Sequence, residues 1–255
     1  MSERVWERYL TKSDKEHVDR YPRSAVGFGD RPALLLIDLY RAVFGDKPEP
    51  LMEAVKTWPS SCGLAGWNSL PHIQKLLGAA RSARIPVIHI TMLADSGMLG
   101  WFDAAHRDSL KAASGSIDGA SLDRKKRSPE IIAEVAPISG EIVLRKPAPC
   151  AFWGTPLAGH LTFLGVDTLI VAGESTSGCV RASVVEAAAH RYRVQVVEEC
   201  VFDRHEATHA MNLFDLHQKY ADVIPIEQAL ELISAKALPR SACKSALACD
   251  LSYYR

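Results

Sequence analysis

A cysteine stands where a predicted strand turns into a predicted helix, a position at which a thiol can act as a nucleophile. Thr168–Ala172 is an apolar run, a turn of Gly, Ser, Thr and Glu follows it, and a helix is expected to open near Cys179. Free N–H groups and the dipole at a helix N-terminus favour a thiolate, and the same groups can receive the oxyanion that its attack creates. A small buried cysteine would show the same local pattern. The interpretation therefore depends on the residues that accompany Cys179.

Two further residues suited to chemistry follow other predicted strands. Asp38 ends the apolar run that begins at Ala33, and Lys146 comes just after the run 141–145. In a parallel sheet the carboxyl ends of the strands lie at one edge, where sites form. There a carboxylate can take the thiol proton, an ammonium can hold the carboxylate, and the sulfur can attack a carbonyl carbon. We predict that Asp38, Lys146 and Cys179 form one catalytic group.

The apolar runs that position these residues alternate with helical patterns. This alternation predicts right-handed βαβ units and an α/β fold: three α/β/α layers around a mainly parallel six-stranded sheet of the Rossmann-like type. The expected strands are 33–38, 86–90, 141–145, 168–172, 193–197 and 223–224, and the expected helices are 68–84, 156–164, 179–191, 205–218 and a last one ending near 235.

The chain divides by composition into three parts. Residues 1–30 are charged and predict an N-terminal arm, 31–235 the catalytic domain, and 236–255 a C-terminal tail. A loop rich in Pro, Gly and Ser is expected between the first strand and about residue 66. Residues 93–127 predict a long surface excursion, in which the basic cluster DRKKR is a solvated loop.

Charge and cysteine usage exclude several classes of function. The 30 basic and 30 acidic residues cancel, which argues against nucleic-acid and membrane partners. No apolar run approaches the roughly 20 residues that span a bilayer, and the N-terminus does not have the pattern of a secretory signal. The six cysteines are scattered without C-x-x-C pairs, so we expect reduced thiols and a cytoplasmic location.

The order Asp38, Lys146, Cys179 on an alternating α/β chain resembles the isochorismatase-like cysteine hydrolases, above all their N-carbamoylsarcosine amidohydrolase branch. The resemblance covers about residues 30–235. It is carried by LLLIDLYRAVF, RKPAPCAFWGTPL, VAGESTSGCVRASVVEAA and VFDRHEATHAMNLFDLHQKYADV, of which TSGCVRA is the most specific part.

The resemblance implies a role for each matching residue. Cys179 would be the nucleophile, Asp38 the proton acceptor and donor, and Lys146 its electrostatic partner. The peptide bond Glu174–Ser175 lies where the family has a cis peptide, which would aim the N–H groups of Ser175 and Cys179 at one oxyanion. Glu174 departs from the small or apolar residue expected there: it either points away and pairs with a basic residue, or alters the pocket.

The resemblance also implies substrate contacts. Arg204 matches a position that contacts a substrate carboxylate, a task for which a guanidinium is suited; an ion pair with Asp203 or Glu206 is the alternative. Candidate apolar walls of a small pocket are Phe44, Phe152 and Trp153, although core packing accounts for them equally well.

The predicted activity is that of a cysteine amidohydrolase that uses no metal or other cofactor. It would cleave the C–N bond of a small linear amide or N-carbamoyl compound that bears a carboxylate, releasing ammonia through a thioester or thiocarbamate. N-carbamoyl amino acids and mono-amides such as maleamate stay open. A homo-oligomer, dimer or tetramer, is expected from the same resemblance.

Two other functions are compatible with parts of the sequence. A catalytically silent member of the family would act as a binding or scaffold protein. His205-Glu206-Ala207-Thr208-His209 is a literal H-E-x-x-H, which on a helix binds zinc and activates water. The motif lies at the start of its expected helix, within the block that resembles metal-free hydrolases, and is therefore the remoter alternative.

Overall fold

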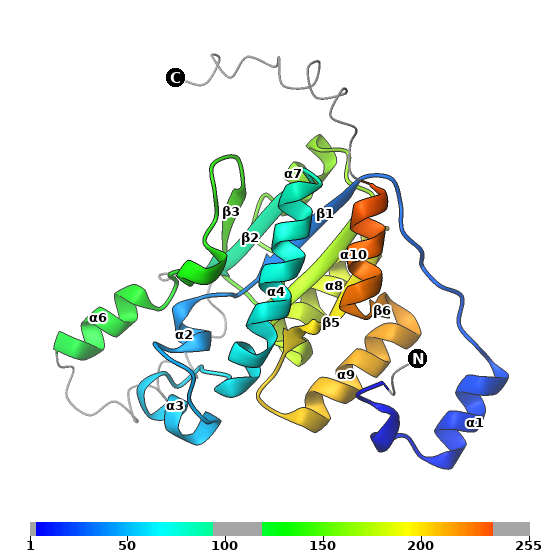
Figure 1. Cartoon of the computed structure of the whole chain (residues 1–255), viewed down its shortest axis with the longest axis horizontal. Helices are drawn as coiled ribbons and strands as arrows, with labels where there is room; N and C mark the ends of the chain where they lie inside the picture. Colours follow the sequence, from blue (N-terminus) through cyan, green and yellow to red (C-terminus); the bar gives the residue numbers. More distant parts are fainter. Residues whose placement is uncertain (1–3, 94–118, 237–255) are drawn as a thin grey trace.

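The centre of the protein is a six-stranded sheet in which every neighbouring pair is parallel (Figure 1). The computed structural model describes residues 4–93 and 119–236. The strand order is β3-β2-β1-β4-β5-β6. The strands are β1 (Pro32–Ile37), β2 (Val87–Met92), β3 (Ile142–Lys146), β4 (Thr168–Glu174), β5 (Arg193–Phe202) and β6 (Asp222–Ile224). The predicted α/β fold is confirmed.

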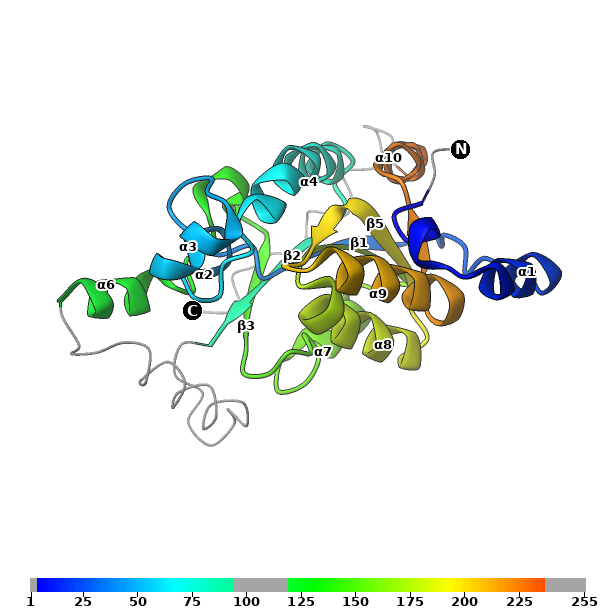
Figure 2. The ribbon, with the colours of Figure 1, turned by 90° about the horizontal axis from the view of Figure 1, so that it is seen from below.

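Helices cover both faces of this sheet (Figure 2). On one face lie α4 (Leu64–Ser82) and α10 (Ile226–Ala235), and on the other lie α7 (Leu157–Phe163), α8 (Arg181–Ala189) and α9 (Glu206–Lys219). The central strands β1 and β4 are buried along their whole lengths, because both of their faces pack against helices. After β1, the chain forms β2 and β3 on one side of that strand, and it then crosses over to form β4 on the other side. In open α/β sheets, ligand sites form at such a reversal, outside the carboxyl ends of the strands.

The structure corrects the sequence prediction in two connecting segments. The expected loop after β1 contains two short helices, α2 (Arg41–Phe44) and α3 (Leu51–Thr57), and α4 begins four residues earlier than predicted. Of the expected surface excursion, residues 94–118 lie outside the described residues. The basic cluster at its end belongs to the helix α6 (Gly119–Arg127), followed by the short turn η3 (Ala133–Val135). Arg127 there is paired with Asp46 at 2.6 Å.

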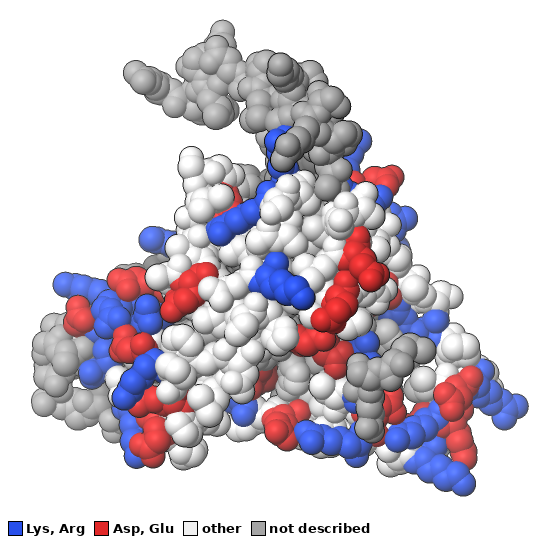
Figure 3. Space-filling view, in the orientation of Figure 1, with Lys and Arg blue, Asp and Glu red and all other residues white. Residues whose placement is uncertain are grey.

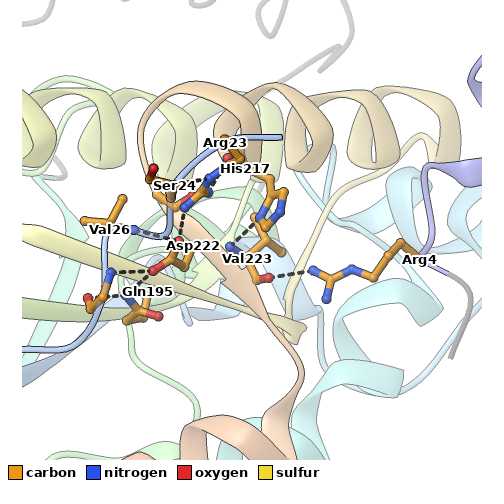
Figure 4. Close-up of polar contacts among 10 residues, drawn as sticks. Arg4, Arg23, Ser24, Val26, Gln195, His217, Asp222 and Val223 are labelled. Carbon is orange, nitrogen blue, oxygen red and sulfur yellow. Dashed lines mark hydrogen bonds and ion pairs between the residues drawn. The ribbon is translucent and has the colours of Figure 1, made fainter. Parts of the chain in front are cut away.

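The described part of the N-terminal arm is anchored to its own chain. It contains the short turn η1 (Glu7–Tyr9) and α1 (Lys12–Arg20), and Trp6 before them is only 4% exposed. Figure 4 shows a second anchor, where Arg23 pairs with Asp222 at the start of β6. The same carboxylate accepts the N–H groups of Val26 and Gly27, at 3.1 and 2.8 Å, and the side-chain amide of Gln195. These contacts hold the segment between α1 and β1 against the last strand.

Charges of both signs are interspersed on the face shown in Figure 3. Over that face no single-sign patch forms, which agrees with the balanced composition. Within residues 4–93 and 119–236, no helix combines the length and apolar character needed to cross a membrane.

Candidate active site

Asp38 and Glu174 are brought side by side by the close approach of β1 and β4. Ile37 is in register with Gly173, so the next residue of each strand stands at the carboxyl edge of the sheet. A Cβ atom at Gly173 would lie 1.9 Å from the carbonyl oxygen of Ile37, and φ there is 122°, so only glycine fits. Asp38 itself adopts a φ of 57°, and its N–H donates to the carbonyl of Ile90 on β2 at 2.9 Å.

The structure brings Asp38, Lys146 and Cys179 into one buried cluster. Lys146 ends β3, two strands away from β1, and its side chain reaches back over β2. Its Nζ lies 2.9 Å from Oδ2 of Asp38 and donates a hydrogen bond to Sγ of Cys179 at 3.2 Å. Asp38 is fully buried and Lys146 is 6% exposed. One ammonium therefore contacts both the carboxylate and the thiol.

Burial dominates the ionisation of this cluster. It raises the pKa of Asp38, although Lys146 and Cys179 oppose the shift. Burial by itself would lower the pKa of Lys146, but Asp38 and Cys179 outweigh it, and the ammonium stays charged. Burial and the charge of Asp38 raise the pKa of Cys179, against the opposing effect of Lys146. Desolvation therefore acts against the thiolate that a helix N-terminus favours.

Cys179 lies in a one-turn π-helix, η4 (Thr176–Val180), that leads into α8. The carbonyl of Ser175 accepts hydrogen bonds from the N–H groups of Gly178 and Val180, each at 3.0 Å. It does not accept one from the N–H of Cys179, which lies between them in the chain. The peptide bond Glu174–Ser175 is cis.

Asp203, which follows β5, and His209, near the start of α9, hold η4 in place. The carboxylate of Asp203 accepts the N–H of Ser177 at 2.9 Å and its hydroxyl at 2.7 Å. Nδ1 of His209 lies 2.8 Å from Oγ1 of the buried Thr176. The turn that carries Cys179 is therefore fixed from the side of α9.

Glu174 pairs with Arg204, one of the two arrangements that sequence analysis left open for it. Nη1 of Arg204 lies 3.0 Å from Oε1 of Glu174, and Nη2 donates to the carbonyl of Ser60. Sγ of Cys62 is 3.5 Å from the same Oε1. The alternative partners of Arg204 are occupied otherwise: Asp203 accepts its backbone N–H at 2.8 Å, and Glu206 pairs with Arg8.

Burial raises the pKa of Glu174 to about 7, although the charge of Arg204 opposes the shift. The charge of Asp38 adds to the increase. Glu174 thus carries its negative charge above neutral pH, beside the catalytic cluster.

The three candidate wall residues lie in different surroundings. Phe44 is fully buried, and its ring meets those of Trp67 and Phe202 edge-on, with centroids 5.6 and 5.5 Å away. Phe152 is stacked on His190 at 5.2 Å, whereas Trp153 is 51% exposed. The latter two line a hollow of about 660 Å³ against α8. Their role as substrate walls stays a prediction.

Two of the H-E-x-x-H side chains contact other parts of the protein. Glu206 pairs with Arg8, and Nδ1 of His209 contacts Thr176 in η4. His205 precedes α9 and has an extended backbone. Among residues 4–93 and 119–236, no group of three or more His, Cys, Asp or Glu side chains is arranged to hold a metal ion.

Sequence analysis did not select Tyr40 or Cys62, and it considered His209 only as part of the H-E-x-x-H motif. Burial raises the pKa of Tyr40 well above its usual value, and the charges of Asp38 and Glu174 add to the shift, so a neutral phenol adjoins the site. Its only sequence signal is its place in the block LLLIDLY, two residues after Asp38. No local pattern marks Cys62, and the H-E-x-x-H pattern that includes His209 does not indicate its contact with Thr176.

The chain is similar to known proteins over most of its length. A family model described as the isochorismatase domain matches residues 32–228. Maleamate amidohydrolase of Pseudomonas putida is 35% identical over 212 residues, which cover 81% of this chain and 88% of that protein. N-carbamoylsarcosine amidase of Arthrobacter sp. is 32% identical over 219 residues, covering 82% and 74% respectively. The solved structure of a cysteine hydrolase from Pseudomonas syringae pv. phaseolicola superimposes with a TM-score of 0.65 at 19% identity, over 85% of this chain and 97% of that one.

Proposed function

Because the chain belongs to the isochorismatase family, whose members similar to it include two named amidases, we propose that it is a metal-independent cysteine amidohydrolase. Its substrate would be a small linear amide or N-carbamoyl compound that bears a carboxylate, and ammonia would leave. The observation that carries this proposal is the position of Lys146 Nζ, 2.9 Å from the Asp38 carboxylate and 3.2 Å from the Cys179 sulfur.

In the first half of the reaction Asp38 takes the thiol proton while Sγ of Cys179 forms a bond to the carbonyl carbon. The raised pKa of Asp38 makes it a stronger base than an ordinary carboxylate, which suits it to a thiol whose pKa is also raised. The carbonyl oxygen becomes an oxyanion, for which the N–H groups of Ser175 and Cys179 are the proposed donors. Asp38 then gives its proton to the leaving nitrogen, the C–N bond breaks, and ammonia departs.

The second half releases the enzyme. A thioester remains after an amide substrate, and a thiocarbamate remains after a ureido substrate. Asp38 takes a proton from water, the hydroxide attacks the carbonyl carbon, and the C–S bond breaks. The sulfur recovers the proton from Asp38, so no proton is gained or lost at the site over one cycle.

The test is ammonia release by the wild-type protein from N-carbamoylsarcosine, other N-carbamoyl amino acids, maleamate, biuret and nicotinamide. Cys179→Ala is run beside it, each protein with and without a chelator. Cys200→Ala is the matched control, because Cys200 is a buried cysteine on β5 that belongs to the core and not to the cluster. We expect turnover by the wild type and the control, loss in Cys179→Ala, and no effect of the chelator.

Each other outcome refutes a different part. Activity that survives Cys179→Ala overturns the assignment of the nucleophile. Activity lost on chelation favours a metal hydrolase. Silence of the wild type across the panel favours a binding or scaffold protein. The predicted homo-oligomer and cytoplasmic location stay predictions.

A further inference from the structure

Both terminal nitrogens of Arg204 already donate to groups of the protein itself. A guanidinium binds a carboxylate best through two parallel N–H···O bonds. In this structure Nη1 is paired with Glu174 at 3.0 Å and Nη2 donates to the carbonyl of Ser60. A substrate carboxylate must therefore compete with groups that the protein itself supplies.

Both cations near the catalytic sulfur already face a carboxylate of the protein before any substrate enters. Lys146 neutralises Asp38 and Arg204 neutralises Glu174, while the raised pKa of Cys179 keeps its thiol uncharged. Asp38, Lys146 and Glu174 are nearly or fully buried, so solvent screens them weakly. A carboxylate added here would be an excess negative charge in a desolvated site, next to two carboxylates of the same sign.

We propose that Glu174 is a specificity-determining residue, which competes with a substrate's carboxylate for Arg204 and shifts the preference of the enzyme toward substrates that present a neutral hydrogen-bonding group there. This inference rests on the proposed amidohydrolase function and refines its substrate class. Maleamate and N-carbamoylsarcosine, after which the two amidases are named, each carry one carboxylate. Glu174 distinguishes those compounds from neutral amides and ureas of the same shape.

The test compares matched substrates on matched proteins. The carboxylates are maleamate and N-carbamoylsarcosine, and their neutral counterparts are the methyl ester of the first and the N-methylamide of the second. Ammonia release is measured at pH 8, above the pKa of about 7 of Glu174, so that its carboxylate is charged. Glu174→Gln removes the charge and keeps the shape of the side chain.

Glu141→Gln is the matched control. Glu141 is also a glutamate paired with an arginine, Arg81, at 2.7 Å, and its side chain is only 7% exposed, but it precedes β3 at the opposite end of that strand from Lys146. Any general effect of losing a buried Glu–Arg pair appears in both variants, and only Glu174→Gln changes the charge beside Arg204.

We expect Glu174→Gln to raise the ratio of kcat/KM for the carboxylate to kcat/KM for its neutral counterpart by roughly 10- to 100-fold, the range of a charged hydrogen bond. Glu141→Gln should leave that ratio unchanged. A merely structural role for Glu174 would lower both values of kcat/KM together and leave their ratio at the wild-type value, which overturns the inference.

Binding separates this inference from the proposed reaction. Calorimetric titration of the same four compounds into Cys179→Ala and Cys179→Ala/Glu174→Gln reports the charge preference without turnover. If the wild type releases no ammonia but the ratio of the dissociation constants shifts as predicted, the proposed function fails and the inference stands. If none of the four compounds binds either protein, both fail.

Discussion

Replacing Lys146 by methionine tests the electrostatics on which the site depends. The substitution keeps the length of the side chain and removes its charge, leaving the carboxylate of Asp38 buried without a partner. At an effective dielectric constant of about 20, two unit charges at their distance of 2.9 Å attract each other by roughly 6 kcal/mol. When one partner of a buried ion pair is removed, the net loss in the free energy of unfolding is about 3–5 kcal/mol.

A loss of this size is a large part of the stability of an ordinary domain, which is about 5–15 kcal/mol. Asp38 can avoid the cost by taking up a proton. Burial already raises its pKa, and Lys146 no longer opposes that shift in the variant. A group whose pKa is higher in the folded state than in the unfolded state loses stabilisation as the pH rises through the folded value. Lys146→Met should therefore be destabilised more at pH 8 than at pH 5.

The measurement is equilibrium unfolding in urea at both pH values, by circular dichroism, for the wild type, Lys146→Met and Asp38→Asn/Lys146→Met. The double variant contains neither charge, so we expect it to recover most of the lost stability at pH 8. The reasoning is refuted if Lys146→Met lies within about 1 kcal/mol of the wild type at pH 8, or if the double variant is as unstable as the single one.

Two further predictions concern ion pairs outside the site. Glu141 contacts Arg81 and His89, and these contacts hold its pKa at about 2, although burial acts in the opposite direction. The ionised carboxylate therefore contributes to the free energy of unfolding above pH 4.5, and this contribution is lost as the pH falls toward 2. Urea unfolding should therefore show Glu141→Gln to be less stable than the wild type by about 3 kcal/mol at pH 6, with the gap narrowing by pH 3, and a gap independent of pH contradicts the assignment. Arg23→Gln should lower the free energy of unfolding by about 1.5–3 kcal/mol, because Asp222 keeps its N–H donors but loses its ion pair. As a control, Lys12→Gln in the exposed pair with Glu16 should change the free energy of unfolding by less than about 0.5 kcal/mol. Equal effects of the two substitutions would show that the arm is not anchored through Asp222.

Much of the fold follows from local patterns in the sequence. A run such as Ala33–Ile37 contains no polar residue, and a strand of this kind is stable only with helices on both of its faces. All six strands overlap the predicted apolar runs, although β5 continues to Phe202, beyond the predicted end at residue 197. The prediction failed where contacts distant in the chain decide the structure. The basic residues at the end of α6 resemble a solvated loop by composition, yet they form a helix whose Arg127 pairs with Asp46.

The membership of the site was predictable for residues that directly end a strand, because the ends of parallel strands meet at one edge of the sheet. Asp38 and Lys146 are such residues, whereas Glu174 was selected only through the family resemblance. Cys62 and His209 lie at the starts of helices that only the packing of α4 and α9 brings against β4 and η4. Arg204 was selected, but its partner was not determined, since Glu174, Asp203 and Glu206 are all acidic residues that sequence alone allows.

The sequence by itself determined the order of the elements and the residue types at the strand ends, because apolar periodicity and chain topology are local properties. Only the tertiary structure decided the charge states. The burial of Cys179 and the nearby charge of Asp38 raise its pKa, against the opposing effect of Lys146. In the same way, the pairing of Glu174 with Arg204 depends on how β4 and β5 pack side by side. The distance between these two side chains cannot be obtained from the sequence.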